Sequence, residues 1–153
     1  MSSRPGSTYE RYLVNTFLEA DKDAVGLLNV RQLSFALYDR LAYPRRRRSF
    51  SLKTTTMLMA VVDRNNRGFL SMQQFIWLHQ TVYRFWKAFR KYDLDNCGWI
   101  WHTDVRAVMA CIRLHVTDYQ MHDVLGVIER RTWVSLEDYV QLCCLSILSR
   151  YST

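Results

Sequence analysis

A unit made of a helix, a short aspartate-rich turn and a second helix recurs along the 153-residue chain. The turns begin at Asp21, Asp63 and Asp93, and each has glycine as its sixth residue and a branched apolar residue as its eighth. A fourth, altered copy aligns with Val134 as its eighth residue. Such a repeat constrains the fold, because one unit cannot bury its apolar face alone and needs a neighbour to cover it.

The spacing inside each turn has a chemical purpose. Positions 1, 3 and 5 place oxygens around one cation, glycine at 6 turns the chain sharply, the carbonyl at 7 adds a ligand, and an acid at 12 reaches back. The eighth residue pairs with the partner loop, so we expect Leu28 opposite Leu70 and Ile100 opposite Val134. This pattern predicts an all-α, EF-hand-like fold: four helix–loop–helix units in two pairs, short β bridges between loops, and a long helix linking the pairs.

Apolar residues at spacings of three and four predict where the helices lie. Ser71, with Gln74 as its capping-box partner, is expected to begin the long helix, and Thr117 to begin a later one. The expected helices cover residues 9–20, 30–41, 52–62, 71–92, from about 103, from 117 to about 128, and 136–148. We expect a flexible tail over 1–8 and an EF-hand-like domain over 9–153, with hands 1 and 2 at about 9–80 and hands 3 and 4 at about 81–150.

The stretch from Tyr83 to Gly98, YRFWKAFRKYDLDNCG, resembles the long helix and third loop of the penta-EF-hand family, which includes calpain small subunits, sorcin, grancalcin and the apoptosis-linked calcium-binding adaptor. Asp21-Lys22-Asp23 resembles the start of the family's first loop. Residues 127–139 are similar to its fourth hand, about two residues short. The resemblance covers roughly residues 9–150 and implies a calcium-binding ancestry and protein partners.

Two departures from the family pattern bear on assembly. The sequence shows no fifth hand, which in the family pairs between subunits, and no Gly/Pro-rich amino-terminal tail. We therefore do not expect a homodimer through a fifth hand. A monomer, or a subunit of a larger assembly, is the expectation.

Two of the loops, and the altered fourth one, lack the ligands that calcium needs. The first keeps Asp21 and Asp23, but valine stands at position 5 and glutamine at 12. The second keeps Asp63 and Asn65, but an arginine stands at 5 and glutamine again at 12. The fourth lacks both length and glycine, with Glu129 at its start and Asp138 at its end. We interpret these three as structural loops.

The third loop is the exception, because it offers Asp93, Asp95, the Trp99 carbonyl and Asp104. Cys97 at position 5 is a poor ligand for hard calcium. Asp104 is one methylene shorter than glutamate, which favours a six-coordinate, magnesium-like site over a bidentate calcium site. The loop therefore predicts at most one weak Ca²⁺ or Mg²⁺ site. The alternative is that these acids only cap the turn.

The charge balance points to acidic partners. The formal net charge is +7, whereas proteins that capture calcium well are usually acidic. The densest cluster is Arg45, Arg46, Arg47 and Arg48, which is either a solvated linker or a contact for an acidic protein or an anionic membrane. No aromatic residue lies among these arginines, so nucleic-acid binding is not expected.

The aromatic residues of the long helix leave two alternatives open. Phe85 belongs to the apolar stripe and stands where the family's partner pocket carries an aromatic residue, whereas Trp77 and Trp86 lie off that stripe. They form either a second buried face or a groove for a partner helix or a Pro-rich peptide.

The sequence contains no catalytic constellation and no phosphate-binding glycine loop. We therefore expect a non-catalytic interaction or structural subunit. A calcium-sensing adaptor and the regulatory subunit of a calpain-like protease are the alternatives. The cysteines have no disulfide-framework spacing and no apolar run could span a bilayer, so a cytoplasmic chain is expected, with cytoskeletal or membrane association as an alternative.

Overall fold

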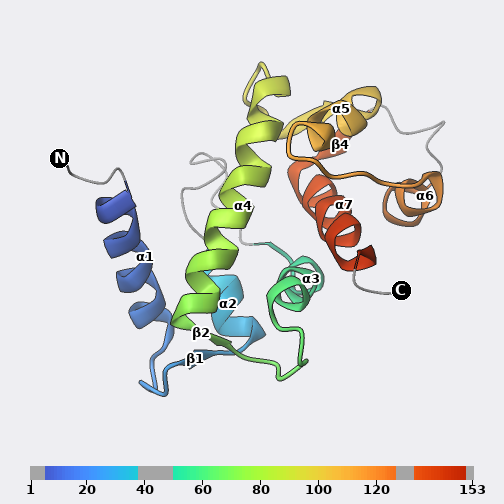
Figure 1. Ribbon diagram of the computed structural model, residues 1–153. Helices are drawn as coiled ribbons and strands as arrows, with labels where there is room; N and C mark the ends of the chain where they lie inside the picture. Colours follow the sequence, from blue (N-terminus) through green and yellow to red (C-terminus); the bar gives the residue numbers. More distant parts are fainter. Residues whose placement is uncertain (1–5, 38–49, 127–132, 151–153) are drawn as a thin grey trace. The chain divides into compact units, whose positions relative to one another are not determined.

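The segments with apolar residues at every third or fourth position form helices, and the residues that follow each glycine turn form short strands (Figure 1). The computed structural model describes residues 6–37, 50–126 and 133–150. The described helices and strands, in chain order, are α1 (Gly6–Ala20), β1 (Leu27–Leu28), α2 (Val30–Leu37), α3 (Leu52–Val62), β2 (Leu70–Ser71), α4 (Met72–Tyr92), β3 (Trp99–Trp101), a 3-10 turn (His102–Asp104), α5 (Val105–Ala110), α6 (Asp118–Leu125), β4 (Trp133–Ser135) and α7 (Leu136–Ser149).

The described residues form two compact units, and the division falls inside α4, between Gln80 and Thr81. Unit 1 comprises residues 6–37 and 50–80. Unit 2 comprises residues 81–126 and 133–150. Each unit holds one pair of strands and its own buried apolar residues, so each is described by itself below.

In unit 1, the strands β1 and β2 pair antiparallel with Leu28 opposite Leu70, and both side chains are fully buried. Phe17 of α1 packs on Phe75 of α4 with 5.9 Å between ring centroids. Fully buried apolar side chains from both loops and all four helical segments therefore share one core. They are Leu13, Phe17, Leu28, Leu33, Leu58, Leu70, Phe75 and Leu78.

In unit 2, β3 and β4 pair antiparallel with Ile100 opposite Val134. Tyr139 of α7 is fully buried, lies 5.1 Å from Phe89 between ring centroids, and donates its hydroxyl hydrogen bond to the Phe85 carbonyl at 2.9 Å. Burial raises the pKa of Tyr139 far above its ordinary value, so the hydroxyl keeps its proton and the bond. This residue joins α7 to the second part of α4.

The strand bridges and two helix starts agree with the sequence. Both predicted pairs, Leu28 with Leu70 and Ile100 with Val134, are confirmed. The capping box at the start of α4 is present, because the Ser71 N–H donates to Gln74 Oε1 at 2.9 Å and the Gln74 N–H donates to Ser71 Oγ at 3.3 Å. Thr117 caps α6 in the same way with Gln120.

Two predicted helices differ from the structure in their bounds. The helix expected from about residue 103 begins as a 3-10 turn, and α5 itself ends at Ala110, because Arg113 adopts φ +62° and reverses the chain. The helix expected to reach about residue 128 ends at Leu125. There Gly126 takes φ +76° and donates its N–H to the His122 carbonyl at 2.8 Å, as a helix-terminating glycine does. The expected extension of α2 to residue 41 lies outside the described residues.

α4, with 21 residues, is far longer than the helices around it and carries no acidic residue. None of the helices in the described ranges has both the length and the apolar character needed to cross a membrane.

Candidate functional site

The three aspartate-rich loops share one internal hydrogen-bond pattern. In each, the two carboxylate oxygens of the first aspartate accept the backbone N–H groups of the fifth and sixth residues. The distances are 3.1 and 2.8 Å for Asp21, 3.0 and 2.7 Å for Asp63, and 3.0 and 2.9 Å for Asp93. All three carboxylates belong to buried residues, so each loop is closed by bonds within itself.

The backbone of the loops repeats as well. The fourth residues, Ala24, Asn66 and Asn96, have φ values of 53°, 52° and 53°. The sixth residues are glycines with φ of 80°, 83° and 92°. A left-handed conformation at the sixth position is costly for other residues, which is why glycine recurs there. The calcium-loop geometry is therefore retained in all three.

The twelfth residue of the first two loops has a different task from metal binding. Gln32 Oε1 accepts the Asn29 N–H at 2.8 Å while Asn29 Oδ1 accepts the Gln32 N–H at 2.9 Å. Gln74 forms the equivalent box with Ser71, described above. Both glutamine side chains thus close the N-terminus of the exiting helix, and their oxygens already accept hydrogen bonds.

The remaining ligand positions of these two loops point to water. Asp23, Val25, Asn65 and Arg67 are all exposed. Valine offers no side-chain oxygen, and the Arg67 guanidinium is a cation at the position where a calcium loop supplies an oxygen. The prediction that both loops are degenerate is consistent with this geometry. The start of the fourth loop, including Glu129, lies outside the described residues.

In the third loop, the predicted ligands bind one another. The Cys97 thiol donates to Asp93 Oδ1 at 3.4 Å and to the Trp99 carbonyl at 3.7 Å. Partial desolvation raises the pKa of Cys97, which keeps the sulfur protonated and a donor. Asp95 is exposed, and Asp104 ends the 3-10 turn without a capping hydrogen bond from its side chain.

These donors do not fit a preformed metal centre. Among the described residues, no three His, Cys, Asp or Glu side chains lie close enough together to hold one ion. Binding in the third loop would require Asp95 and Asp104 to close on the cation and the Cys97–Asp93 hydrogen bond to break. The weak site there stays a prediction.

The residues expected to bind a partner differ in exposure. Trp77 is 49% exposed, whereas Phe85 is 2% exposed and belongs to the packing of its unit. A partner could contact Phe85 only after a rearrangement. Trp86 is half-buried, packs 5.5 Å from Tyr83 between ring centroids, and its Nε1 is buried with no hydrogen-bond acceptor in the described part of the chain. Arg45, Arg46, Arg47 and Arg48 lie outside the described residues.

An exposed tryptophan cluster in unit 2 was not anticipated. Trp99, Trp101 and Trp133 are 38%, 49% and 45% exposed on the outer face of the β3–β4 pair. Trp101 and Trp133 are directly opposite in the register and stack at 4.1 Å between ring centroids, 28° between planes. Their exposure could have been predicted from the sequence. In a strand, the residues on either side of an inward-facing residue face outward, and these tryptophans are neighbours of the bridge residues Ile100 and Val134.

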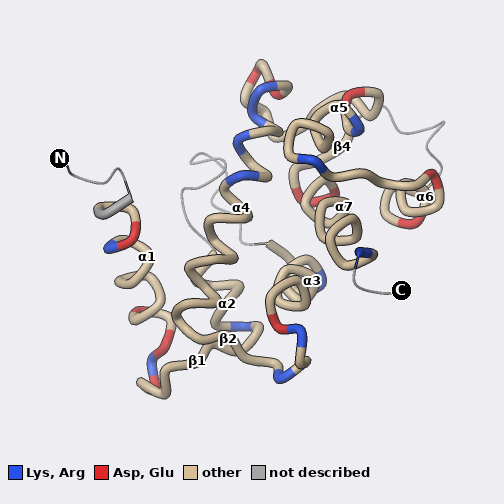
Figure 2. The backbone as a smooth tube through the Cα atoms, viewed as in Figure 1, with Lys and Arg blue, Asp and Glu red and all other residues tan. Residues whose placement is uncertain are grey.

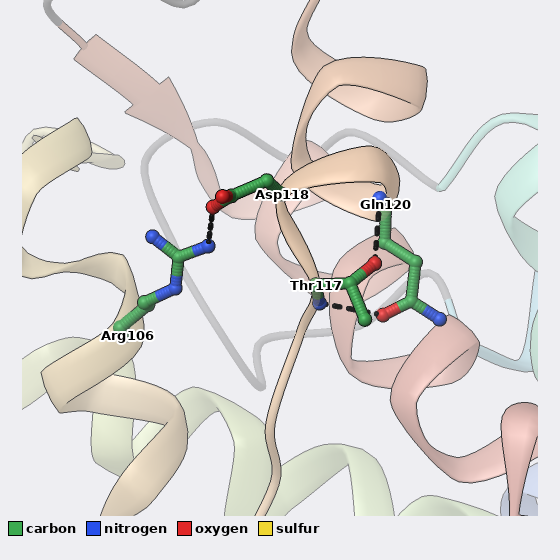
Figure 3. A network of polar contacts seen from close by, with 4 residues as sticks. All are labelled: Arg106, Thr117, Asp118 and Gln120. Carbon is green, nitrogen blue, oxygen red and sulfur yellow. Dashed lines mark hydrogen bonds and ion pairs between the residues drawn. The ribbon is translucent and has the colours of Figure 1, made fainter.

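A small polar network connects α5 with the start of α6 (Figure 3). The Arg106 guanidinium pairs with Asp118 at 2.5 Å, and beside it the Thr117–Gln120 capping box starts α6. Side-chain exposures of 53% and 94% mean that water screens the ion pair, so the capping box is the stronger determinant.

Comparison with known proteins agrees with this geometry. No protein-family model matches the chain. Among solved structures, a homolog of programmed cell death 6 protein from Leishmania major Friedlin is similar, with a TM-score of 0.61 and 28% sequence identity over 85% of this chain and 69% of that one. That neighbour is a penta-EF-hand protein.

The chain has an EF-hand fold. The likeness supports the penta-EF-hand resemblance coarsely and does not address the fifth hand. It also supports an EF-hand protein of the calcium-binding type.

Proposed function

We propose that this EF-hand chain is a non-catalytic protein-interaction or structural subunit whose loops are held by their own hydrogen bonds and need no calcium. The supporting observation is the engagement of the twelfth loop residues: Gln32 and Gln74 serve as capping-box acceptors. A calcium sensor uses the acid at this position to pull the exiting helix toward the ion. Here that helix is already anchored, so calcium has little left to change.

Exposed aromatic area supports the partner-binding part of the proposal. Tryptophan is a frequent anchor at protein interfaces, and leaving it in water forgoes on the order of 2 kcal/mol per side chain. Trp77 in unit 1 and the Trp99, Trp101 and Trp133 cluster in unit 2 are all well exposed. A partner that covers such rings would recover this free energy without any change in the fold.

The third loop favours one alternative, a weakly calcium-tuned adaptor. It keeps aspartate at positions 1, 3 and 12. In that case a single Ca²⁺ or Mg²⁺ would bind through Asp93, Asp95, Asp104 and the Trp99 carbonyl, with Cys97 as a non-ligand. A role as the regulatory subunit of a calpain-like protease is compatible with either form.

Calorimetric titration of the whole chain with Ca²⁺, repeated with Mg²⁺, tests the proposal. We expect no site of micromolar affinity and at most one weaker site. That weaker site should vanish in Asp104→Ala and persist in Asp23→Ala, because only the former alters the third loop. Two or more micromolar calcium sites would contradict the proposal.

A second readout concerns partners. The immobilised chain should capture a protein partner from cell extract equally well in EDTA and in calcium. Capture that occurs only with calcium would favour the sensor instead.

A further inference from the structure

The charges of unit 2 are unevenly distributed. Its described residues include seven Lys or Arg and seven Asp or Glu, so the described part of the unit is neutral overall. Four of the seven cations lie on α4, which carries no acid at all. In Figure 2 the tube of α4 shows blue segments and no red ones. The described part of unit 2 therefore has no net charge, although its segment of α4 is strongly cationic.

Three of these cations share one side of the helix. Arg84, Lys87 and Lys91 are spaced i, i+3 and i+7, which places them within a sector of about 60° and along about 10 Å of the axis. All three are exposed. We call this surface the α4 cationic face. Arg90 is not part of it, because its guanidinium hydrogen-bonds to Asn96 in the third loop.

No carboxylate in the described part of the chain neutralises this face. Within those ranges the ion pair found in unit 2 is Arg106 with Asp118, which shows that a cation of this unit does pair where an acid is within reach. Lys87 also lies over an aromatic ring, with its ammonium 5.8 Å from the centroid of the Tyr83 ring. The face therefore combines three unneutralised cations with an aromatic edge.

We propose that the α4 cationic face binds an acidic polypeptide segment, with Asp or Glu side chains spaced to match Arg84, Lys87 and Lys91. This inference rests on the proposed function and names the partner's chemistry. The reason to choose a polypeptide is size. The face extends about 10 Å along the helix axis, a length that one short acidic segment can match, whereas a lipid surface or a duplex presents negative charge over a much wider area. A short acidic segment can contact the face alone.

The test uses the full chain and a fluorescein-labelled Glu/Ala peptide whose glutamates are spaced i, i+3 and i+7. Binding is followed by the anisotropy of the peptide at about 0.15 M ionic strength. The triple variant Arg84→Glu, Lys87→Glu, Lys91→Glu should raise the Kd by about tenfold or more, because three favourable pairs become repulsive. A peptide with Gln in place of Glu should not bind. If circular dichroism shows that the reversal variant is unfolded, the corresponding triple Gln variant serves instead, with a smaller expected loss.

The control is a second triple variant, Lys22→Glu, Lys53→Glu, Arg67→Glu. These cations are also exposed but belong to unit 1, and the net charge changes by the same amount. We expect its Kd to stay within about threefold of the wild type, because none of these three charges belongs to the α4 cationic face and salt at this ionic strength screens charges beyond about 8 Å. An equal loss in both triple variants would mean that net charge attracts the peptide, and the proposal would be overturned.

Two further arms separate the outcomes. Phosphatidylserine vesicles and a single-stranded oligonucleotide are titrated in parallel. If reversal of the face abolishes binding of either while leaving the acidic peptide unaffected, the partner class is wrong. Every titration is run in EDTA and in calcium. If peptide binding requires calcium and is lost in the charge-reversal variant, the metal-independent function is refuted and the α4 cationic face remains supported. If binding is unchanged in the charge-reversal variant, only the proposal for the face is refuted.

Discussion

At the scale of single residues, the first aspartate of each of the three aspartate-rich loops accepts backbone N–H groups and so holds its loop closed. In a calcium-binding loop, the bound cation contributes to this closure. Asp63 shows this most clearly, because Arg67 and Gln74 leave its loop without a ligand set. Its two oxygens accept the N–H groups of Arg67 and Gly68 at 3.0 and 2.7 Å while the residue is only 6% exposed. Two backbone donors therefore depend on this one side chain.

Replacement of Asp63 by alanine should lower the free energy of unfolding by about 1–2 kcal/mol, because two partly buried N–H donors lose their acceptor. The loss should be the same in EDTA and in calcium. Urea denaturation followed by circular dichroism measures it. Asp23→Ala is the matched control, since Asp23 is exposed and should change stability by less than about 0.5 kcal/mol. A calcium-dependent loss in Asp63→Ala would indicate that this loop binds metal.

At the scale of helices and strands, local capping decides where several helices begin. Thr117 Oγ1 accepts the Gln120 N–H at 3.0 Å, and Gln120 Oε1 accepts the Thr117 N–H at 3.0 Å. α6 has only eight residues, so it has few internal hydrogen bonds to rely on. Its start depends on this box.

Thr117→Ala should therefore destabilise unit 2 by about 1 kcal/mol, the usual cost of losing an N-cap. Thr117→Ser keeps the hydroxyl and should lose little. Hydrogen exchange of the α6 amides, compared with those of α7, gives the measurement. Equal protection of α6 in the alanine variant and the wild type would show that packing, not the cap, holds this helix.

Much of the element pattern was predictable, and the exceptions have physical causes. Helix α3 has the predicted bounds, and the bridge residues were identified because position 8 must be apolar and paired. The end of α5 at Ala110 is not predictable in this way, because apolar periodicity continues through Ile112 and no local pattern indicates the left-handed conformation at Arg113. The exposure of the aromatic side chains could not be predicted from the helix alone. Phe85 and Trp77 lie on the same helix, and Phe85 is buried only because other elements pack on it.

At the scale of the whole molecule, the cysteines divide into two classes. Cys143 and Cys144 are fully buried on α7, whereas Cys97 and Cys111 are exposed. Burial raises the pKa of both the Cys143 and the Cys144 thiol. Cys143 and Cys144 are therefore core thiols of unit 2.

Stability should consequently fall at alkaline pH. The unfolded thiols lose protons above about pH 8.5 while the buried ones keep theirs, so the unfolded state gains relative stability as the pH rises. The upper limit is about 2 kcal/mol per thiol between about pH 8 and pH 10. Thermal unfolding across this range measures the slope. It should flatten in Cys143→Ala/Cys144→Ala and remain in the exposed-site control Cys111→Ala; an unchanged slope in the double variant would contradict this origin.

The capping boxes at Gln32 and Gln74 have a consequence for how such a protein evolves. A capping box forms as well with glutamate as with glutamine at its third helical position. Selection for a folded chain therefore cannot distinguish an acid from an amide there, although that one choice decides whether the loop has its bidentate calcium ligand. The bidentate acid can therefore be lost or regained at these two positions without the fold ever being at risk, whereas Val25 and Arg67 would still leave each loop without an oxygen at position 5.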